Sequence, residues 1–181
     1  MKYCSQCGEP VEHRVPEGDN RPRHVCPSCG QIHYFNPRIV AGTIPCWQGK
    51  VLLCKRAIEP RYGYWTLPAG FMENAETTTE AAMRETWEEA RARVDVEGLY
   101  TMVNVPHIDQ VHLFFRASLI DGEYGVGEES LDVQLFEEDN IPWEELAFPT
   151  VKETLEHFFA DRQQNDFQVR VSDIRRPMRK D

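Results

Sequence analysis

Runs of aliphatic and β-branched residues separated by polar turns dominate the chain from position 38 onward. The first two runs, residues 38–47 and 50–56, flank Gln48-Gly49, and a glycine-containing turn between such runs is typical of a β-hairpin. Further strand candidates lie at residues 94–105, 111–120 and 131–136. This pattern predicts a β-rich domain that begins near position 38.

Two regions show helical spacing instead of alternation. Residues 77–90 are expected to form a helix, because Thr77 followed three positions later by Glu80 is a capping-box pattern. A second helical region is indicated at 143–146 and 150–159, where the latter segment has enough apolar residues for one buried face. The last stretch, 168–181, is rich in arginine and is expected to be extended. Strands and helices together predict the α+β class.

The first 35 residues have a different character, with two Cys-x-x-Cys pairs and few large aliphatic side chains. The pairs are Cys4/Cys7 and Cys26/Cys29, and each is followed by a glycine that suits the tight turn of a zinc knuckle. Four thiolates at this spacing predict a zinc ribbon, and its zinc would be structural because no coordination position remains open for water. The alternative is four ordinary thiols or a redox-active pair.

Composition and charge narrow the function classes. With 181 residues, 41% of them hydrophobic, the chain can hold one principal domain and a small extra module. The formal net charge of −10 opposes binding to nucleic acid or anionic membranes unless a basic patch exists locally. No apolar stretch approaches the roughly 18 residues of a membrane span, and the N-terminus has no apolar signal segment. We therefore expect a soluble, cytoplasmic protein without membrane association.

Several apolar side chains are expected to be buried rather than functional. Cys46 and Cys54 lie in apolar surroundings and resemble small buried hydrophobes. Trp65, Phe114 and Phe115 are expected in the core, since strands commonly bury alternate aromatic residues.

The most informative segment is the acidic helix. On a helix, Glu85, Glu88 and Glu89 fall within an arc of about 100°, while Met83, Trp87 and Ala90 occupy the opposite, apolar side. No lysine stands one turn away to relieve the repulsion between the carboxylates, whereas Mg²⁺ would relieve it. The alternative is a solvated acidic face in which Arg84 pairs with Glu80 or Glu88.

The six residues Gly70, Glu76, Arg84, Glu85, Glu88 and Glu89 resemble the Nudix box, G-x5-E-x7-R-E-U-x-E-E-x-G-U, where U is a bulky aliphatic residue. Thr86 and Ala92 depart from the aliphatic positions, and Arg91 stands where the pattern has glycine. The resemblance implies a Nudix-type α/β/α sandwich around a mixed sheet at residues 36–165. A zinc ribbon at 1–35 would precede it, and an extended tail at 166–181 would follow.

The resemblance also implies roles for individual residues. Glu85 and Glu89 would be ligands of Mg²⁺ (or Mn²⁺), with Glu88 assisting and the carbonyl of Ala69 completing the site. Arg84 would orient the glutamates together with Glu76. An acidic residue on a distant loop often serves as ligand or general base in such enzymes, and Glu129 is the favoured candidate here, with Glu128 as its neighbour. Water would then attack a phosphorus atom without a covalent enzyme intermediate.

The substrate class follows from the same resemblance. A zinc ribbon joined to a Nudix domain is similar to the NADH diphosphatases, but their SQPWPFP signature is missing. The segments NVPHIDQVHLFFRASL, GEESLDVQLF and IPWEELAFPTV look more like zinc-ribbon Nudix hydrolases associated with ADP-ribose and FAD. We therefore expect an ADP-X substrate, with NADH less favoured, and a homodimer. Binding candidates, by sequence proximity alone, are Arg56, Arg61, Tyr64 and Arg116, together with Tyr62 and Phe35.

Two other functions remain open at this point. One is a zinc-ribbon nucleic-acid-binding protein on an inactive Nudix scaffold, although the net charge argues against it. Its basic patch would be formed by the tail residues Arg170, Arg175, Arg176, Arg179 and Lys180. The other is removal of an RNA cap, within the enzyme class.

Overall fold

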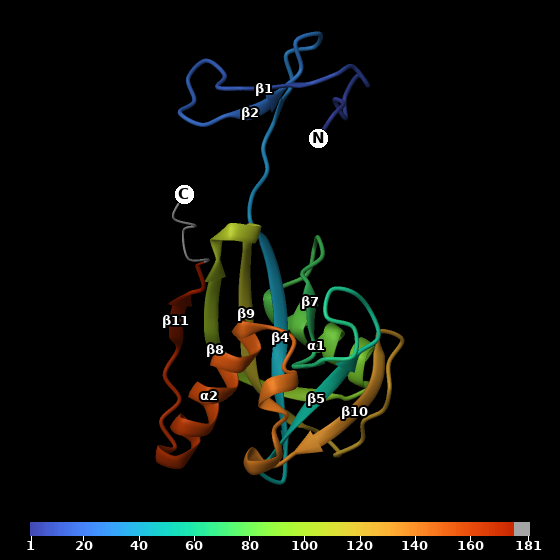
Figure 1. Ribbon diagram of the computed structural model, residues 1–181, viewed down its shortest axis with the longest axis vertical. Coiled ribbons are helices and arrows are strands. Elements are labelled where there is room, and N and C mark those ends of the chain that lie inside the picture. Colours follow the sequence, from blue (N-terminus) through green and yellow to red (C-terminus); the bar gives the residue numbers. More distant parts are fainter. Residues whose placement is uncertain (176–181) are drawn as a thin grey trace. The chain divides into compact units, whose positions relative to one another are not determined.

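The computed structural model describes residues 1–175 and divides into two compact units, residues 1–36 and a larger unit that begins at Pro37 (Figure 1). Arg176, Arg179 and Lys180 of the expected basic patch lie outside the described residues. Within the described part, neither long helix combines the length and apolar character that a membrane-spanning segment requires.

The N-terminal unit is a small antiparallel sheet in the order β1-β2-β3. Its strands are β1 (Glu12–Arg14), β2 (Arg23–Val25) and β3 (Ile32–His33). The first cysteine pair precedes β1, and the second lies in the turn between β2 and β3. Buried side chains here are mainly Cys4, Val25, Cys26 and His33, so the sulfur cluster takes the place of an aliphatic core.

The larger unit is built on a mixed sheet that, within the described residues, has eight strands. The main path runs β10-β5-β4-β9-β8-β11, with β6 paired to β5 and β7 to β4. Only β4/β9 and β11/β8 are parallel pairs on this path. The strands are β4 (Arg38–Trp47), β5 (Lys50–Arg56), β6 (Trp65–Thr66), β7 (Ala69–Phe71), β8 (Val94–Val105), β9 (Gln110–Leu119), β10 (Ser130–Phe136) and β11 (Arg170–Asp173).

The predicted hairpin and strands are confirmed. Gln48 and Gly49 both have positive φ, 49° and 81°, which is the backbone geometry of a tight hairpin turn between β4 and β5. Trp65, Phe114 and Phe115 are buried, as is Cys54, whereas Cys46 is only half-buried.

Helices cover both faces of the sheet, which confirms the α/β/α sandwich (Figure 1). Helix α1 (Thr78–Ala90) packs Ala81 and Ala82 against Ala41 and Phe115. Helix α2 (Pro149–Gln164) packs Leu155 and Phe158 with Phe114 on the other face. Short 3-10 turns lie at η1 (Pro106–Ile108), η2 (Glu138–Asn140) and η3 (Trp143–Glu145). The helical signal at 143–146 is thus a single 3-10 turn.

The capping box of α1 is confirmed, because Thr77 Oγ1 accepts from the Glu80 amide at 3.2 Å and Glu80 Oε2 accepts from the Thr77 amide at 2.7 Å. The expected apolar side of this helix needs correction. Ala90 is buried, but Met83 and Trp87 are each 42% exposed. Small residues and Thr86 face the sheet instead, because the sheet lies too close to the helix axis for large side chains. The Thr86 hydroxyl contacts Thr43 Oγ1 at 2.7 Å in this interface.

The tail is partly a strand of the main sheet. Residues Arg170–Asp173 form β11 beside β8. Arg170 makes a bidentate ion pair with Asp161 of α2, and the Tyr100 hydroxyl donates to the same carboxylate at 2.7 Å. The pKa of Asp161 is lowered to about 2, chiefly by the Arg170 hydrogen bond. Arg175 pairs with Asp173 at 3.4 Å, so the described tail arginines are engaged with aspartates.

Candidate functional site

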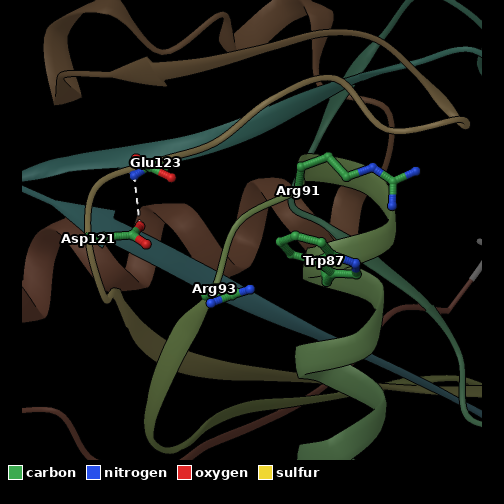
Figure 2. Close-up of a pocket in the computed structure, with 5 residues that line it drawn as sticks. All are labelled: Trp87, Arg91, Arg93, Asp121 and Glu123. Carbon is green, nitrogen blue, oxygen red and sulfur yellow. Dashed lines mark hydrogen bonds between the residues drawn. The ribbon is translucent and has the colours of Figure 1, made fainter.

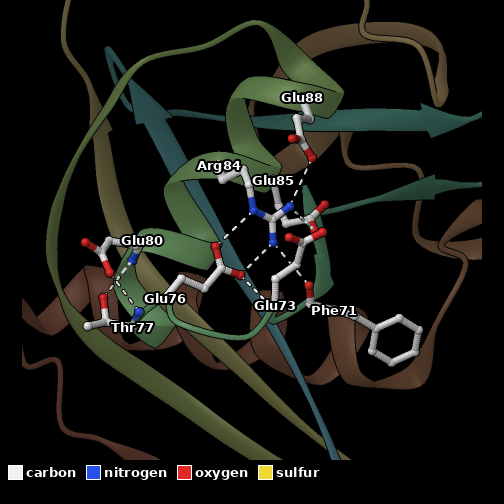
Figure 3. A network of polar contacts seen from close by, with 8 residues as sticks. All are labelled: Phe71, Glu73, Glu76, Thr77, Glu80, Arg84, Glu85 and Glu88. Carbon is white, nitrogen blue, oxygen red and sulfur yellow. Dashed lines mark hydrogen bonds and ion pairs between the residues drawn. The ribbon is translucent and has the colours of Figure 1, made fainter.

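Arg84 is the centre of a charged network on the outer side of α1 (Figure 3). Its guanidinium donates two hydrogen bonds to Glu76, 3.0 and 2.8 Å long, and one each to Glu85 at 2.7 Å and Glu88 at 3.0 Å. A fifth bond, 3.1 Å long, reaches the carbonyl oxygen of Phe71 at the end of β7. The Arg84 bond and the Glu73 amide lower the pKa of Glu76 to about 2. Arg84 therefore ties the helix to the loop that leads into it.

Glu85 lies directly against β7. A methyl group added at Gly70 would collide with the Glu85 carboxylate, so only glycine allows this approach. Burial raises the pKa of Glu85, although the Arg84 bond opposes the shift. The first glycine of the motif, Gly70, is therefore required because a larger residue there would overlap the Glu85 carboxylate.

Glu89 is the most buried acidic residue on α1 and is only 6% exposed. Its Oε2 accepts one hydrogen bond, 3.2 Å long, from the amide of Ala69. Burial, followed by the negative charges of Glu85 and Glu129, raises the pKa of Glu89 to about 8. The Ala69 backbone therefore lies at the Glu89 carboxylate. The contact is made by its amide, whereas the family resemblance implied its carbonyl as a metal ligand.

The loop that carries Glu129 is anchored to the C-terminal end of α1. The amides of Gly125 and Gly127 donate to the carbonyls of Ala90 and Glu89 at 2.7 and 3.1 Å, and Ser130 Oγ donates to the Glu89 carbonyl at 2.8 Å. A side chain at Gly127 would overlap the Glu88 carbonyl. This close packing brings the Glu129 charge within range of both Glu85 and Glu89.

Arg56 is the cation that the structure adds to this acidic group. It is buried, its Nε donates to the Pro60 carbonyl at 2.9 Å, and its guanidinium lies 5.0 Å from the Phe148 ring centre. Its positive charge lowers the pKa of Glu89, against the larger effect of burial. The amide of neighbouring Ala57 donates to the Glu129 carbonyl at 2.8 Å, so the two loops touch.

Arg61 and Tyr64 belong to the same loop as Arg56. The Arg56 amide donates to the Tyr64 carbonyl at 2.9 Å, and the Arg61 guanidinium lies 5.4 Å from the Tyr64 ring centre. Arg61, Tyr62 and Tyr64 are exposed. Three sequence candidates, Arg56, Arg61 and Tyr64, are therefore brought together, and Arg56 is the one whose charge acts on Glu89 of the acidic helix.

Arg116 and Phe35 are placed differently. Arg116 lies on the α2 face of β9, where it pairs with Glu97 at 2.7 Å and stacks 3.9 Å over Phe167. The acidic helix covers the opposite face, so the structure does not bring Arg116 to it. Strand alternation separates the two faces, and sequence proximity to Phe115 could not reveal this. Phe35 belongs to the N-terminal unit.

The four ribbon cysteines form a tight cluster. Their sulfur atoms lie within 4.8 Å of one another, and no other group of three or more potential ligands in residues 1–175 meets this limit. The Cys4–Cys29 and Cys7–Cys26 sulfur distances are 3.7 and 3.5 Å. Zn–S bonds of 2.3 Å at tetrahedral angles would place sulfurs about 3.8 Å apart, so the cluster fits zinc. Glycines 8 and 30 have φ of 78° and 73°, as the knuckle turns require.

His33 contributes outside the sulfur cluster. Its Nε2 lies 3.4 Å from Cys4 Sγ, and the Gln6 amide donates to the same sulfur at 3.3 Å. A hydrogen bond from the Cys29 backbone amide lowers the pKa of Cys26 to about 7, which favours the thiolate that zinc binds. The neighbouring Cys26 and Cys29 sulfurs raise the pKa of Cys7 to about 12, so the four thiols do not all favour the thiolate before a metal binds.

The acidic site also passes a test of fit for a hard divalent cation. Burial raises the pKa of both Glu85 and Glu89. The charges of Glu88 and Glu129 raise the pKa of Glu85 further, and those of Glu85 and Glu129 raise the pKa of Glu89, so ionising the whole group is unfavourable without a counter-charge. Oxygen ligands of this kind are what Mg²⁺ prefers. The positive charges of Arg84 and Arg56 neutralise only part of the negative charge of this group, so a bound cation would be stabilised by the rest.

Some residues of the site were not singled out from the sequence. Gly127 and Ser130 hold the Glu129 loop, and Phe148 lies under Arg56. Gly42 allows β7 to approach β4, because a side chain there would collide with Ala69 and Pro68. Glycine in a strand is a signal of close backbone approach that could have identified Gly42.

Two family models match the chain, and together they cover nearly all of it. Residues 2–35 match the zinc-ribbon module described as Nudix N-terminal, and residues 36–164 match the NUDIX domain. Among solved structures, a NUDIX hydrolase from Nitrosomonas europaea is 50% identical, with a TM-score of 0.91 over 96% of this chain and 100% of that one.

Curated relatives carry two different activity names. An ADP-ribose pyrophosphatase from Methanocaldococcus jannaschii is 32% identical over 119 residues, 64% of this chain and 69% of the relative. An NAD-capped RNA hydrolase, NudC, from Chromobacterium violaceum is 38% identical over 94 residues, 51% of this chain but only 33% of the relative's length. The matched domains, the fold and the Arg84-centred acidic helix agree, and the chain belongs to the Nudix hydrolase family, with an N-terminal zinc-ribbon module.

Proposed function

We propose that the larger unit hydrolyses the diphosphate bond of a nucleoside diphosphate linked to a second group, with Mg²⁺ (or Mn²⁺) as the catalytic cation. The observation that carries the proposal is the arrangement of the acidic helix, in which Arg84 bonds both Glu85 and Glu88 while the buried Glu89 accepts a hydrogen bond from the Ala69 amide. A bound cation would supply Lewis acidity toward phosphate oxygens and lower the pKa of the attacking water.

The protein's own groups have separate tasks in this proposal. Glu85 and Glu89 hold the cation, with Glu88 and the Ala69 carbonyl assisting. Arg84 positions Glu85 and Glu88 through its hydrogen bonds and fixes the helix through Glu76. Glu129 accepts the proton of the attacking water in this proposal, and the support for this role is that its loop is fixed to the end of α1. Arg56 binds a phosphate oxygen of the substrate and offsets its charge.

The favoured substrates are ADP-ribose and FAD, split to AMP and a second phosphate. Support comes from the ADP-ribose pyrophosphatase relative and from the exposed Arg61 and Tyr64 beside Arg56. A tyrosine ring offers a stacking surface for adenine, and a guanidinium offers donors to phosphate. NADH is the less favoured member of the same class.

Zinc in the ribbon has a structural role in this proposal. All four cysteine sulfurs are available as ligands, so no position is left for a reacting water. Catalysis would then depend on Mg²⁺ or Mn²⁺ and folding of the ribbon on zinc.

A second candidate activity is removal of a dinucleotide cap from RNA, favoured by the NAD-capped RNA hydrolase relatives. The bond broken is again a diphosphate, so the same carboxylates serve both candidates. A panel of ADP-ribose, FAD, NADH and capped RNA, with identification of the products, separates the two.

The decisive variant is Glu89→Gln, which keeps the size of the side chain and removes a negative ligand. It should abolish Mg²⁺-dependent turnover while the circular dichroism spectrum and bound zinc remain unchanged. Glu156→Gln, an exposed change on α2, is the matched control and should retain full activity. Retained turnover in Glu89→Gln would reject the ligand role.

A further inference from the structure

A small cavity lies at the C-terminal end of α1, apart from the carboxylate group. It measures about 170 Å³ and is lined by Trp87, Arg91, Arg93, Asp121 and Glu123. Trp87 leaves the helix on the side away from the sheet and is 42% exposed. Figure 2 shows Asp121 and Glu123 on the loop across from the indole. A polar residue would fit this position of the helix equally well, and a partly exposed tryptophan gains little from burial there. The exposure of Trp87 therefore points to a binding role.

Arg91 adds a second unusual feature. It ends α1 in the left-handed conformation, with φ of 48° and ψ of 25°, at the position where the Nudix box has glycine. A non-glycine residue pays a steric penalty in this region, so strain is present at Arg91. The conformation places its guanidinium 5.9 Å from the Trp87 ring centre.

Arg93 approaches the same ring, at 5.5 Å. The two arginines are only loosely engaged, since the Arg91–Glu128 distance is 4.0 Å and, among the described residues, no ion pair of Arg93 lies within that limit. Two guanidinium groups thus approach the indole, and the carboxylates of Asp121 and Glu123 line the same cavity. A planar heteroaromatic ring with donors and acceptors on its edge, next to a phosphate, matches this arrangement.

We propose that this cavity is a subsite for an unpaired nucleobase of an RNA strand attached to the diphosphate that is cleaved. The base stacks on Trp87, its edge meets Asp121 and Glu123, and Arg91 and Arg93 bind the adjoining phosphates. The proposal rests on the proposed diphosphate hydrolysis and names a substrate class for it.

The loop that carries Glu129 supports the connection with the cleavage site. Trp87 lies on the side of α1 away from Glu85 and Glu89, because residues two apart on a helix point in nearly opposite directions. Arg91, however, lies 4.0 Å from Glu128, the neighbour of Glu129, so a strand leaving the carboxylate group would pass round the C-terminal end of α1 beside this loop to reach the indole. A cavity this small and open binds a free nucleotide weakly, but tethering to a bound cap raises the effective concentration of the base.

The experiment compares one dinucleotide in two forms, free and at the 5′ end of a short unpaired RNA. In each of the three single variants, Trp87→Ala, Arg91→Gly and Arg93→Gln, kcat/KM for the RNA-linked form should fall about tenfold. This is the scale of one lost base stack. The value for the free dinucleotide should stay at the wild-type level. Lys152→Gln, an exposed charge removal on α2, is the matched control and should change neither value.

Arg91→Gly gives the sharpest contrast, because it restores the residue of the family pattern and relieves the left-handed strain. Its Tm should rise while RNA-linked turnover falls, a combination that damage to the fold cannot produce. Arg93→Gln should also reduce the slope of log affinity against log salt for the RNA by about 0.7, one phosphate contact on a single strand.

Binding of the labelled capped RNA to the Glu89→Gln background, followed by fluorescence anisotropy, tests the subsite without turnover. If wild-type protein cleaves no diphosphate, the proposed function fails, yet a weaker affinity after Trp87→Ala still supports the subsite. Equal loss on both substrate forms, or loss on neither, overturns it. A change of oligomeric state on light scattering, without substrate discrimination, would instead identify the face as a contact between two copies.

Discussion

At Glu89, burial and like charge both oppose ionisation, and only the Ala69 amide and the more remote Arg56 favour it. The sequence could indicate that Glu89 belongs to an acidic face, because 3.6-residue periodicity fixes which residues share a side. It could not indicate that Glu89, rather than Glu88, would be the buried member. That depends on how closely Gly42, Gly70 and Gly127 let the surrounding backbone approach.

The raised pKa of Glu89 predicts a pH effect on the cation-free protein. The folded pKa is about 8 and the ordinary value is 4.5, so between these limits the folded state holds a proton that the unfolded chain has released. Stability from this group is therefore present below about pH 4.5 and declines as pH rises toward 8. Glu89→Gln, which cannot ionise, should exceed wild type in unfolding free energy at pH 8 by on the order of a few kcal/mol.

Urea denaturation of protein dialysed free of Mg²⁺, at a series of pH values, measures this difference. The gap should close near pH 4.5, and added Mg²⁺ should stabilise wild type more than the variant. Identical unfolding curves across the range would mean that Glu89 is ionised without a cation.

Among the elements, α1 shows what a pattern can and cannot determine. Its start was predictable because Thr77 and Glu80 satisfy the first backbone amides locally. Its buried side was not, because hydrophobicity alone favoured Met83 and Trp87, whereas close packing on the sheet selected Ala81, Ala82 and Thr86. The 125–130 loop meets the helix through long-range hydrogen bonds, and no local signal in the sequence encodes those.

The ribbon, an element with little apolar core, should depend on zinc for its folding. Removing zinc with a selective chelator, in excess Mg²⁺, should expose residues 1–36 to limited proteolysis while the initial rate of diphosphate hydrolysis stays the same. Mass spectrometry of the fragments and a parallel rate assay measure both effects. An immediate loss of activity that zinc restores and Mg²⁺ does not would contradict this division of labour.

At the scale of the whole molecule, charge is distributed unevenly. The four basic residues of the ribbon, Lys2, Arg14, Arg21 and Arg23, are matched by four acidic ones, Glu9, Glu12, Glu17 and Asp19. The formal charge of −10 therefore belongs entirely to the residues from Pro37 onward. A polyanionic substrate would meet this unit more readily when divalent cations neutralise part of its charge.

Assembly into a homodimer remains a prediction, and β11 offers the place to test it. Among the described strands it lies at one edge of the sheet. Val171 within it is 61% exposed, and Val169 just before it is 55% exposed. Exposed edge strands with apolar side chains readily pair with another chain. Val171→Asp should convert a dimer to a monomer on light scattering, while Leu131→Asp on β10, the opposite edge, should not. Dissociation by the β10 variant alone would place the contact elsewhere.

The way Gly125, Gly127 and Ser130 fasten their loop to the last turn of α1 has a consequence for how relatives can diverge. From Gly125 to Ser130 an insertion would uncover helix carbonyls and displace Glu129, so the length of this segment is constrained. Residues 121–124, just upstream, carry no such anchor to the helix carbonyls among the bonds described. Relatives can therefore acquire new substrate preferences by lengthening residues 121–124 or by changing the side chains around Trp87, without displacing Glu129 or the acidic residues of α1.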